Sequence, residues 1–526
     1  MTTLGLSPGA RRPREAWPRP SALDRAIGYF SPATRYRREL ARVRLALARR
    51  HYDAATPGRR TQGWRRTAGD ANATGFDRLH WLREHARDLV RNNAHAVAGL
   101  EKIVDDAIGW GITAADEPPA WKVWANTTEC DAAGRHDLSG LQALIMRTVA
   151  ESGECLVRIR ARRPTDGLAL PFQLQVLEPD YLDTGLDRAE TPQSNRVVQG
   201  VEFDRLGRRS AYWLFENHPG ASHRTGSGTL LSPSRPVPAR WILHIYREQR
   251  PGQVRGVTWF APIILRLKDF DEYEDATLMK QKVAALLAVV ATDHDGSAAA
   301  LGRESTEAGE ELFDFLEPGM ILNMPPGKTI DVVTPPTVRE YADYSAVSLR
   351  AVAAGLGVPY EDLTGDYTNL PFSAARMSRL RHWARVERWR WQIMIPQFLA
   401  PVWSYAASLP GVGMPPETEW TAPGMPMIDP DKEGLAMMRN VRTAATSLSE
   451  ALRERGYNPR QILAELADDF KLLDELGLRL DVDPRYMTQN GQAQSIAGAG
   501  GTVEDDDDTP PAGSDDGSDD GSDDGA

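Results

Sequence analysis

The fold is decided by one stretch, VREYADYSAVSLRAVAAGLGVPYEDLTGDYTNLPFSAARMSRLRHWARVERWRWQIMIPQFLAPVWSY, residues 338–405. Its first part has the apolar spacing of a helix, and we predict that this helix ends at Gly355 and Gly357. An irregular polar segment with two prolines and a glycine follows, and a long helix rich in Arg and Trp begins at 372. A basic, aromatic helix pair around a polar break is typical of a protein that contacts a large polyanion or a large partner.

Charge is distributed very unevenly along the 526 residues, a length that suits two to four packed units. Residues 504–526 contain eleven acidic residues and no basic one, which equals the net charge of −11 for the whole chain. Residues 1–66 contain sixteen arginines against four acidic residues. Such asymmetry is typical of interaction tails. The composition of 489–526, with SDDG three times, predicts a disordered acidic tail.

The chain has two cysteines, Cys130 and Cys155, which exclude a disulfide framework and a thiolate metal cluster and favour a reducing compartment. The first residues, MTTLGLSPGARR, have no apolar stretch of signal-peptide length. The longest apolar run, 283–291, is about half of what a membrane span needs. We therefore expect no membrane partner.

Apolar periodicity predicts a mixed, α+β architecture. Helical spacing indicates one helix over 76–108, another over 138–149, a further helix within 258–293 and a helical block over 432–478 that contains a Ser447-x-x-Glu450 cap. Between them, the period changes to that of strands over 154–247. The predicted strands are CLVRIRAR, FQLQVLEP, VVQGVEFD, SAYWLFEN and RWILHIYR, with a hairpin turn at Asp204, Leu206 and Gly207. This region is predicted to be antiparallel and packed on helices.

Motifs of catalysis and cofactor binding are missing from the sequence. PPGKT at 325–329 ends like a phosphate loop, but Leu322 stands where the first glycine is needed and two prolines remove amides. Gly355-Leu356-Gly357 lacks the third glycine of a dinucleotide loop and ends a helix. There is no His-Glu-x-x-His and no Cys-x-x-Cys pair. We therefore expect no enzymatic activity, no cofactor and no metal.

The helix over 372–405 carries a row of arginines, of which Arg381, Arg385 and Arg388 share one face. We favour pairing of these arginines with acidic residues of neighbouring chains over direct contact with phosphate. Four tryptophans of this helix are predicted to be packing anchors and not base-stacking platforms: Trp383, Trp389, Trp391 and Trp403. The helix over 338–356 has two different stripes of side chains that could form contacts. This suits a helix that contacts the equivalent helices of two neighbouring subunits in a ring.

Taken together, nine segments resemble the portal proteins of tailed bacteriophages, lambda-like family, over roughly residues 55–480. Each segment is weak alone, and their number and order carry the resemblance. They are GRRTQGW (58–64), ARDLVRNNAHAVAGLEKIVDDAIGWGI (86–112), CDAAGRHDLSGLQ (130–142), ESGECLVRI (151–159), LEPDYLD (177–183), GVEFDRLGRRSAYWL (200–214), ILHIYREQRPGQVRGVTWFAPIILRL (242–267), LEPGMI (316–321) and LGVPYEDLTGDYTNLPFSAAR (356–376).

The resemblance implies a ring, usually of twelve subunits, at one capsid vertex, with DNA passing through its centre. It also implies a portal fold with an α/β wing, a helical stem, a small α/β clip and a helical crown. On this chain the parts would be a basic arm (1–66), wing (67–257), first stem helix (258–293), clip (294–336), second stem helix (337–356), tunnel loop (357–371), the long wing helix with its connector (372–425), crown (426–488) and acidic tail (489–526).

By the same resemblance, the tunnel loop would lie nearest to the DNA. Its candidate residues are Asp366, Tyr367, Thr368, Asn369 and Leu370. The loop contains no Lys or Arg, which suits a channel for moving DNA because tight phosphate contacts would hold the DNA in place. Candidate contacts to a neighbouring subunit or to DNA are Arg339, Arg350, Arg381, Arg385 and Arg388, and candidate lumen residues of the stem are Lys268, Lys280 and Lys282.

The function we predict is a non-enzymatic portal through which DNA is packaged and ejected. Its expected partners are further copies of the chain, the terminase large subunit as the motor, the major capsid protein or scaffold, a head-tail adaptor and double-stranded DNA. Its expected location is the virion, and the host cytoplasm during assembly. One alternative is a nuclease of a phage packaging cluster, which would need clustered carboxylates for Mg²⁺. Another is a scaffold that binds nucleic acid through residues 1–66.

Overall fold

The computed structural model describes residues 69–75, 78–221, 233–286, 290–293, 328–331, 341–368, 370–478, 480 and 485. The chain divides into two compact units, Met1–Gly75 and Phe76–Ala526. In the first unit, helix α3 (Ala71–Gly75) follows Asp70, whose Oδ1 accepts a hydrogen bond of 2.7 Å from the amide of Ala73. The predicted basic arm and acidic tail, and most of the predicted clip, lie outside the described residues.

Four helices begin the second unit: α4 (Leu79–Asn92), α5 (Ala94–Ile108), α6 (Pro119–Asn126) and α7 (Leu138–Ser152). The prediction of one helix over 76–108 is wrong, because the helix breaks at Asn93. Asn93 has extended dihedral angles, and its side chain accepts a hydrogen bond of 2.8 Å from the amide of Ala96. Asparagine is among the best residues for this capping role, so Asn93 starts a second helix instead of continuing the first.

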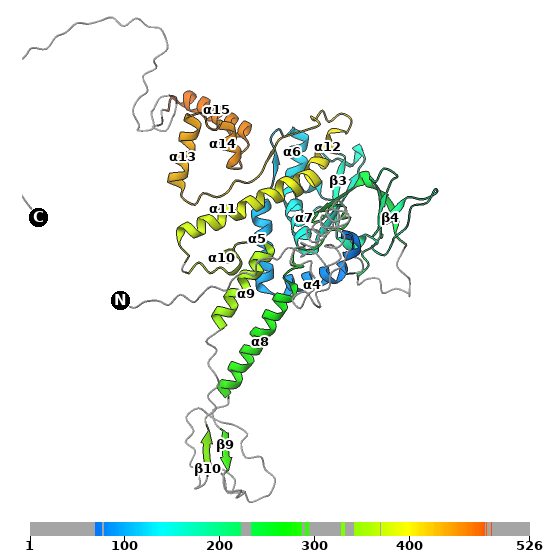
Figure 1. Ribbon diagram of the computed structural model, residues 1–526. Coiled ribbons are helices and arrows are strands. Elements are labelled where there is room, and N and C mark those ends of the chain that lie inside the picture. Colours follow the sequence, from blue (N-terminus) through cyan, green and yellow to red (C-terminus); the bar gives the residue numbers. More distant parts are fainter. Residues whose placement is uncertain are drawn as a thin grey trace, which may run out of the picture. The chain divides into compact units, whose positions relative to one another are not determined.

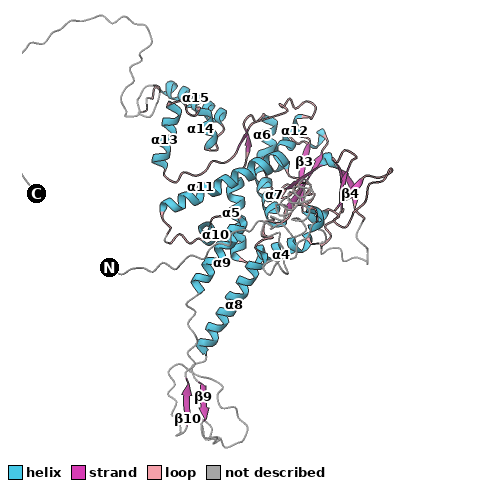
Figure 2. Ribbon diagram, viewed as in Figure 1, coloured by secondary structure: helices cyan, strands magenta, loops and turns pink. Residues whose placement is uncertain are grey.

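Seven strands over 154–246 confirm the predicted antiparallel region (Figures 1 and 2). They form a three-stranded sheet in the order β3-β2-β8 and a four-stranded sheet in the order β4-β5-β6-β7, with every pair antiparallel. Their bounds are β2 (Glu154–Ala161), β3 (Phe172–Leu177), β4 (Arg196–Val198), β5 (Val201–Phe203), β6 (Arg209–Leu214), β7 (Arg235–Pro238) and β8 (Ile242–Tyr246).

Two details of this region differ from the prediction. VVQGVEFD forms two strands, because Gln199 and Gly200 take φ angles of 48° and 82° and turn the chain between them. Strand β7 was not predicted, since its sequence RPVP contains two prolines. It lies at the end of the four-stranded sheet, where proline is tolerated because no further strand needs its missing N–H. The hairpin turn at Asp204–Gly207 is confirmed: Asp204 Oδ1 accepts from the amides of Leu206 and Arg208.

A fully buried carboxylate, Glu154, joins the first sheet to the loop after β8. Arg255 Nε donates to both carboxylate oxygens, at 2.9 and 3.0 Å, and the amide of Gly256 donates at 2.7 Å. His244 on β8 and Arg83 on α4 complete the shell at 2.9 and 3.2 Å. Burial alone would raise the pKa of Glu154, but Arg255 and His244 outweigh it and hold that pKa well below its usual range.

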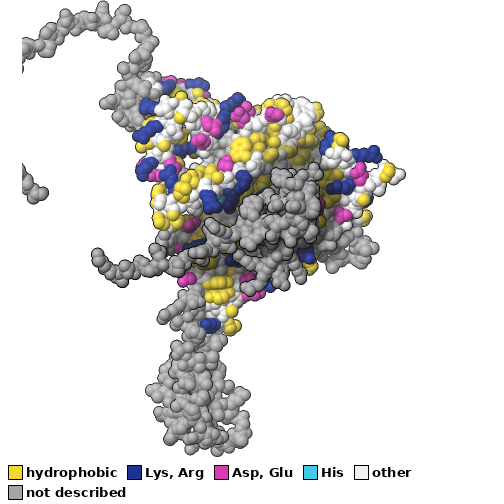
Figure 3. Space-filling model, in the orientation of Figure 1, with side chains coloured by type: hydrophobic (Ala, Val, Ile, Leu, Met, Phe, Trp, Pro, Cys, Tyr) yellow, Lys and Arg dark blue, Asp and Glu magenta, His cyan; other side chains and the backbone are white. Residues whose placement is uncertain are grey.

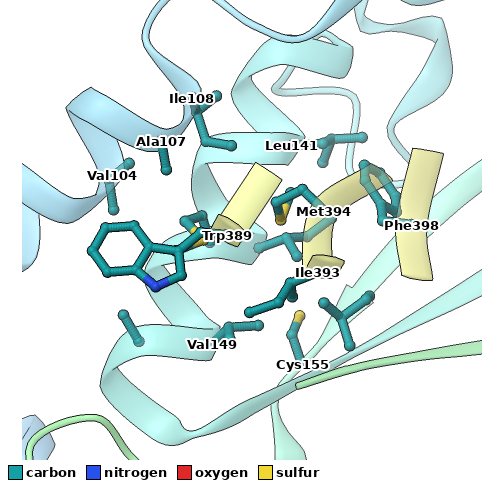
Figure 4. Close-up of a cluster of buried hydrophobic side chains, with 14 of the residues drawn as sticks. Val104, Ala107, Ile108, Leu141, Val149, Cys155, Trp389, Ile393, Met394 and Phe398 are labelled. Atoms are coloured by element: carbon teal, nitrogen blue, oxygen red, sulfur yellow. The ribbon is translucent and has the colours of Figure 1, made fainter. Parts of the chain in front are cut away.

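The main core lies between helices and the three-stranded sheet (Figure 4). Side chains of α5 and α7 pack against Cys155 of β2 and against the long helix predicted over 372–405. Figure 4 shows Val104, Val149, Trp389 and Met394 pointing into this shared core. Both cysteines are buried and unpaired, and burial raises the pKa of the Cys130 thiol to about 12.

The long helix predicted over 372–405 is present in three consecutive parts: α11 (Phe372–Trp389), a π-helical segment (Arg390–Leu399) and α12 (Ala400–Ala407). Trp389 and Trp403 are buried, as predicted for packing anchors. Trp391 is half exposed, and for it the prediction is wrong. Its indole N–H donates to Glu387 at 2.7 Å, a contact at the surface.

Helices α8 (Ile264–Leu286) and α9 (Tyr341–Leu356) lie side by side (Figure 1), with Tyr341 donating a hydrogen bond of 2.6 Å to Glu274. The strands β9 (Val290–Asp293) and β10 (Lys328–Asp331) pair antiparallel, as do β1 (Thr113–Ala114) and β11 (Trp420–Thr421). No helix in the described part of the chain is both long enough and apolar enough to span a membrane.

Three helices follow β11: α13 (Pro430–Arg442), α14 (Leu448–Glu454) and α15 (Pro459–Leu476). The predicted cap of α14 is confirmed, because Ser447 Oγ accepts a hydrogen bond of 3.1 Å from the amide of Glu450. Asn458, which caps α15, also donates through its amide group to the carbonyl of Ala115 at 2.5 Å. These bonds hold the last helices to the strand pair β1-β11 and its flanks.

Candidate functional site

Residues 357–371 connect α9 to α11 and form a structured break. Helix α9 ends where Gly357, with a φ angle of +88°, donates its amide to the carbonyl of Ala353 at 2.8 Å. The predicted stop at Gly355 and Gly357 is confirmed, because α9 ends at Leu356, between the two glycines. The break was predicted to be irregular, but it contains a short helix, α10 (Tyr360–Thr364). Pro359 presets the backbone for its start, and Gly365, with a φ angle of +69°, ends it.

Close packing on α5 holds α10 in place. Leu356 and Leu363 are both buried, and they cover Gly99 on α5. A Cβ atom at position 99 would lie 2.5 Å from Leu356 Cδ1, which is closer than Cβ atoms come, and 3.0 Å from Leu363 Cδ1, which is a tight contact. Glycine at this position therefore lets the end of α9 and the short helix α10 approach the backbone of α5.

A chain of polar contacts ties the break to α5 and α11. Lys102 Nζ on α5 lies 3.1 Å from Asp362 Oδ2 on α10 and 3.0 Å from Asp106 Oδ2. Asp106 in turn lies 2.8 Å from Nε2 of His382, a buried residue of α11. The other ring nitrogen of His382 is 3.1 Å from the carbonyl oxygen of Gly357. The start of the break and its short helix α10 are therefore tied to α11 and α5.

The carboxylate of Asp106 is kept charged by this arrangement. Burial alone would raise the pKa of Asp106, but the hydrogen bond from His382 and the charge of Lys102 outweigh burial and hold the pKa below its usual value. A charged Asp106 can accept from both partners at once, which is what links α5 to α11.

The remaining residues of the break are exposed at its tip. Asp366, Tyr367 and Thr368 are exposed, and Leu370 is half-buried. Asp366 Oδ1 accepts from the amide of Thr368 at 3.0 Å, and these bonds with Thr368 lower the pKa of Asp366. Tyr367 donates to Asp362 at 2.7 Å, which raises the pKa of Tyr367 to about 12. Asn369 lies outside the described residues.

Arginines gather beside the break. Arg350 is exposed, with its guanidinium 5.1 Å from the centre of the Tyr360 ring. Arg381 and Arg388 are exposed on α11, and Arg385 is half-buried against Gly357. Arg350, Arg381 and Arg385 line one hollow of about 300 Å³. Arg385 and Arg388 line a second hollow of about 580 Å³ together with Arg247. Arg339 lies outside the described residues.

Two arginines near the break were not singled out in the sequence. Arg247 follows β8 and has no local pattern that marks it. Arg390 was counted in the basic row of the long helix, but it is buried. Its guanidinium donates to the carbonyls of Asp106, Ala107 and Pro423 at 2.6 to 2.7 Å. Since α5 ends at Ile108, Arg390 caps that helix.

The candidate lysines of the stem lie on α8. Lys268 forms an exposed ion pair of 3.4 Å with Glu272, one turn further along the helix. Lys280 and Lys282 are exposed. Among the described residues, no contact joins any of these three lysines to the break.

One group of metal-ligand type occurs in the described part of the chain: Glu178, Asp180 and His218. Its carboxylates already have cationic partners, because Arg87 Nη2 lies 3.0 Å from Glu178 and 2.7 Å from Asp180, and Arg83 lies 2.8 Å from Asp180. A bound cation would have to displace Arg87. We therefore interpret this group as an ion-pair network.

Comparison with known proteins identifies the class of the chain. The model of a family described as phage portal protein, lambda family, matches residues 57–390. The probable portal protein of Halomonas phage phiHAP-1 is 26% identical over 501 residues, which cover 89% of this chain and 94% of that relative. Portal protein B of Escherichia phage lambda is 23% identical over 342 residues, which cover 57% of this chain and 63% of that protein.

Among solved structures, the neck of a native gene transfer agent particle computed with C12 symmetry is similar, with a TM-score of 0.46 and 13% identity, covering 74% of this chain and 97% of that one. The neck of an empty particle computed with C6 symmetry gives a TM-score of 0.47, 14% identity and the same coverage. The sequence relatives and the family match define a portal protein of a tailed phage. The chain belongs to the lambda family of phage portal proteins.

Proposed function

We propose that copies of this chain form a ring at one vertex of a phage capsid and that double-stranded DNA passes through the centre of the ring during packaging and ejection. Twelve subunits are expected from the family resemblance. In this proposal the chain makes and breaks no covalent bonds, and a separate terminase motor supplies the energy. The ring would be part of the virion, and assembly would take place in the host cytoplasm.

Residues 357–371 would face the channel as the tunnel loop. The observation that carries this assignment is the polar chain from Asp362 through Lys102 and Asp106 to His382, which fixes the start of the break and α10 and leaves its tip exposed. An element that contacts moving DNA must keep its position against the load. It must also bind phosphate weakly, and this tip offers carboxylate, hydroxyl and amide groups with no cation.

The other assignments follow the same plan. α8 and α9 would form the stem, and Lys268, Lys280 and Lys282 would line its lumen. The last three helices would form the crown, and residues 67–257 and 372–425 the wing. The segment 294–336 would be the clip that docks the terminase large subunit and later a head-tail adaptor. Contact with the major capsid protein or scaffold would be made by the wing.

Two measurements test the proposal. Native mass spectrometry of the purified chain should give a closed oligomer of about twelve subunits, and electron microscopy should show a central hole; a monomer would overturn the ring. Asp366→Lys should leave the ring intact and reduce the DNA packaged per particle, because it places a cation at the tip of the loop. Glu417→Lys, a change of the same charge in the connector after α12, is the matched control. A normal DNA content for Asp366→Lys would refute the assignment of the loop.

A further inference from the structure

A hollow of about 580 Å³ beside the break is lined by three arginines from two parts of the chain. Arg247 comes from the segment after β8, and Arg385 and Arg388 come from α11. Residues 354–357, at the end of α9, complete one wall, and Gln392 and Gln397 offer further hydrogen-bond donors. In Figure 3, Lys and Arg side chains gather over α11 between hydrophobic side chains.

None of the three guanidinium groups pairs with an acidic side chain of the described residues, and two of them are held in place by packing. Arg247 is half-buried and stacks on Trp259, with its guanidinium carbon 4.4 Å from the ring centre. Arg385 packs on Gly357, where a Cβ atom would collide with its guanidinium. Glu248 also lines the hollow, but its carboxylate accepts from the amide of Gly252 at 3.1 Å.

This concentration of like charge is unfavourable in the isolated chain. Burial lowers the pKa of Arg247, and the charges of Arg388 and Arg385 lower it further. Burial and the charges of Arg381 and Arg388 act in the same direction on the pKa of Arg385. An anion in the hollow would relieve both effects, because a guanidinium binds a carboxylate or a phosphate through paired hydrogen bonds.

Shape and function favour a carboxylate over DNA phosphate. A single acidic side chain fits a hollow of this size, whereas a DNA duplex presents its phosphates on a rod far wider than the opening. A strong phosphate site would also add a salt-sensitive binding free energy at every step of DNA movement. The ring of the proposed function brings two different faces of the chain together at each subunit boundary, so a basic face needs an acidic counterpart.

The described residues contain such a counterpart on α8. The segment Asp269–Asp275 has five acidic residues and no basic one. Asp269 and Asp275 are exposed. Burial raises the pKa of Asp271, and the charges of Glu274 and Asp275 raise it further, so acidic groups crowd this surface. Lys268 pairs with one of them, Glu272, at 3.4 Å.

The acidic segment and the basic hollow belong to neighbouring parts of the fold. α8 begins next to α9, where a Cβ atom at Gly355 would lie 2.3 Å from Ile263. We infer that the hollow of Arg247, Arg385 and Arg388 receives an exposed carboxylate of the segment Asp269–Asp275 from the neighbouring subunit. The inference rests on the proposed ring. It assigns a pair of oppositely charged surfaces to the contact between neighbouring subunits of that ring.

Charge reversal and charge exchange test the pairing. Arg385→Glu with Arg388→Glu should raise the protein concentration needed for ring formation about tenfold or more, since buried like charges would then face each other at the boundary. Adding Asp269→Lys and Asp275→Lys to the same chain should restore assembly. Arg379→Glu, on the same helix but outside both hollows, is the control and should assemble like the unaltered chain. Circular dichroism and urea unfolding of each variant show whether its subunits fold.

Photo-crosslinking identifies the occupant directly. A benzophenone amino acid at position 392, which lines the hollow and is exposed, should yield a covalent dimer of the chain whose linked peptide contains residues 269–275. A crosslink to DNA, a crosslink within one chain only, or normal assembly of the double arginine variant would overturn the inference. If the unaltered chain forms no ring at all, the proposed function fails instead, and the mass measurement separates the two cases.

Discussion

The ammonium group of Lys102 lies 3.1 Å from the carboxylate of Asp362, and through this contact helix α5 holds the break between α9 and α11. The same ammonium group is 3.0 Å from Asp106, which lies 2.8 Å from His382 on α11. One lysine therefore connects α10, in the segment that we place at the channel, to the contact between α5 and α11. The strength of this connection decides how far the tip of the loop can move.

Lys102→Met should loosen the break without disrupting the fold. The ion pairs of Lys102 are partly buried, so we expect a loss of about 0.5–1 kcal/mol in the free energy of unfolding. Amide hydrogen exchange of residues 360–368 should accelerate about twofold to fivefold. Lys432→Met is the matched control, because Lys432 forms an exposed pair with Asp429 at 2.8 Å. Equal rates of amide hydrogen exchange at 360–368 in the unaltered chain and in Lys102→Met would show that Lys102 does not restrain the loop.

Gly99→Ala should displace α10 and the end of α9. The added Cβ atom meets the methyl groups of Leu356 and Leu363, which must shift, at an expected cost of about 1–3 kcal/mol in the free energy of unfolding. Gly434→Ala is a sharp control, because position 434 lies inside α13 with no atom near its Cβ. Removing a glycine there should stabilise the chain by about 0.4–1 kcal/mol. Urea unfolding of both variants measures the contrast, and the same sign for both would contradict the packing argument.

The helix, break and second helix at 338–405 could be predicted because their signals are local. Glycine and proline mark the break, and apolar spacing marks the helices on either side. The π-helical segment Arg390–Leu399 contains one such signal, Pro396, but a proline inside a helix does not specify a π-helix. Apart from Arg390, its buried side chains are apolar at spacings that fit an α-helix almost as well, so the sequence predicted one uniform helix.

The contacts that fix the break could not be predicted, because they join residues far apart in the chain. Asp106 and His382 are separated by 276 positions. Arg247 joins Arg385 in one hollow only because β8 and α11 fold together. Local spacing could place Arg381, Arg385 and Arg388 on one face, but it could not show that Arg390, two residues further on, is buried and caps α5.

Acidification should weaken the connection through Asp106. The folded state holds the pKa of Asp106 below its usual value of about 3.9. A depressed carboxyl pKa contributes stability that is present above the unfolded value and is lost as the pH falls through the folded value. The free energy of unfolding should therefore drop more steeply below about pH 4 in the unaltered chain than in Asp106→Asn. Urea unfolding between pH 2 and pH 6 gives the free energy of unfolding against pH for both proteins. Parallel curves would show that Asp106 does not contribute to the pH dependence.

Deletion of residues 504–526 should leave ring formation intact. These residues contain eleven acidic groups and no base, so copies brought together in a ring repel one another and cannot supply a packed interface. Light scattering after size-exclusion chromatography should give the same subunit number with and without the segment. A shift to monomers after the deletion would show that the acidic residues take part in assembly.

Glu154→Gln should be among the most destabilising single changes in this chain. The carboxylate is fully buried and accepts hydrogen bonds from Arg255, Gly256, His244 and Arg83. Glutamine keeps the size of the side chain but leaves the buried guanidinium of Arg255 without its negative partner, while Arg83 keeps only Asp180. Breaking a buried ion pair in this way costs about 3–5 kcal/mol. Glu178→Gln changes a half-exposed carboxylate that pairs with Arg87, and it should cost less than about 1 kcal/mol. Urea unfolding at pH 7 compares the two. Because the Glu154 network joins α4, β2 and the loop that carries Arg255, a small effect of Glu154→Gln would mean that packing alone holds these elements together.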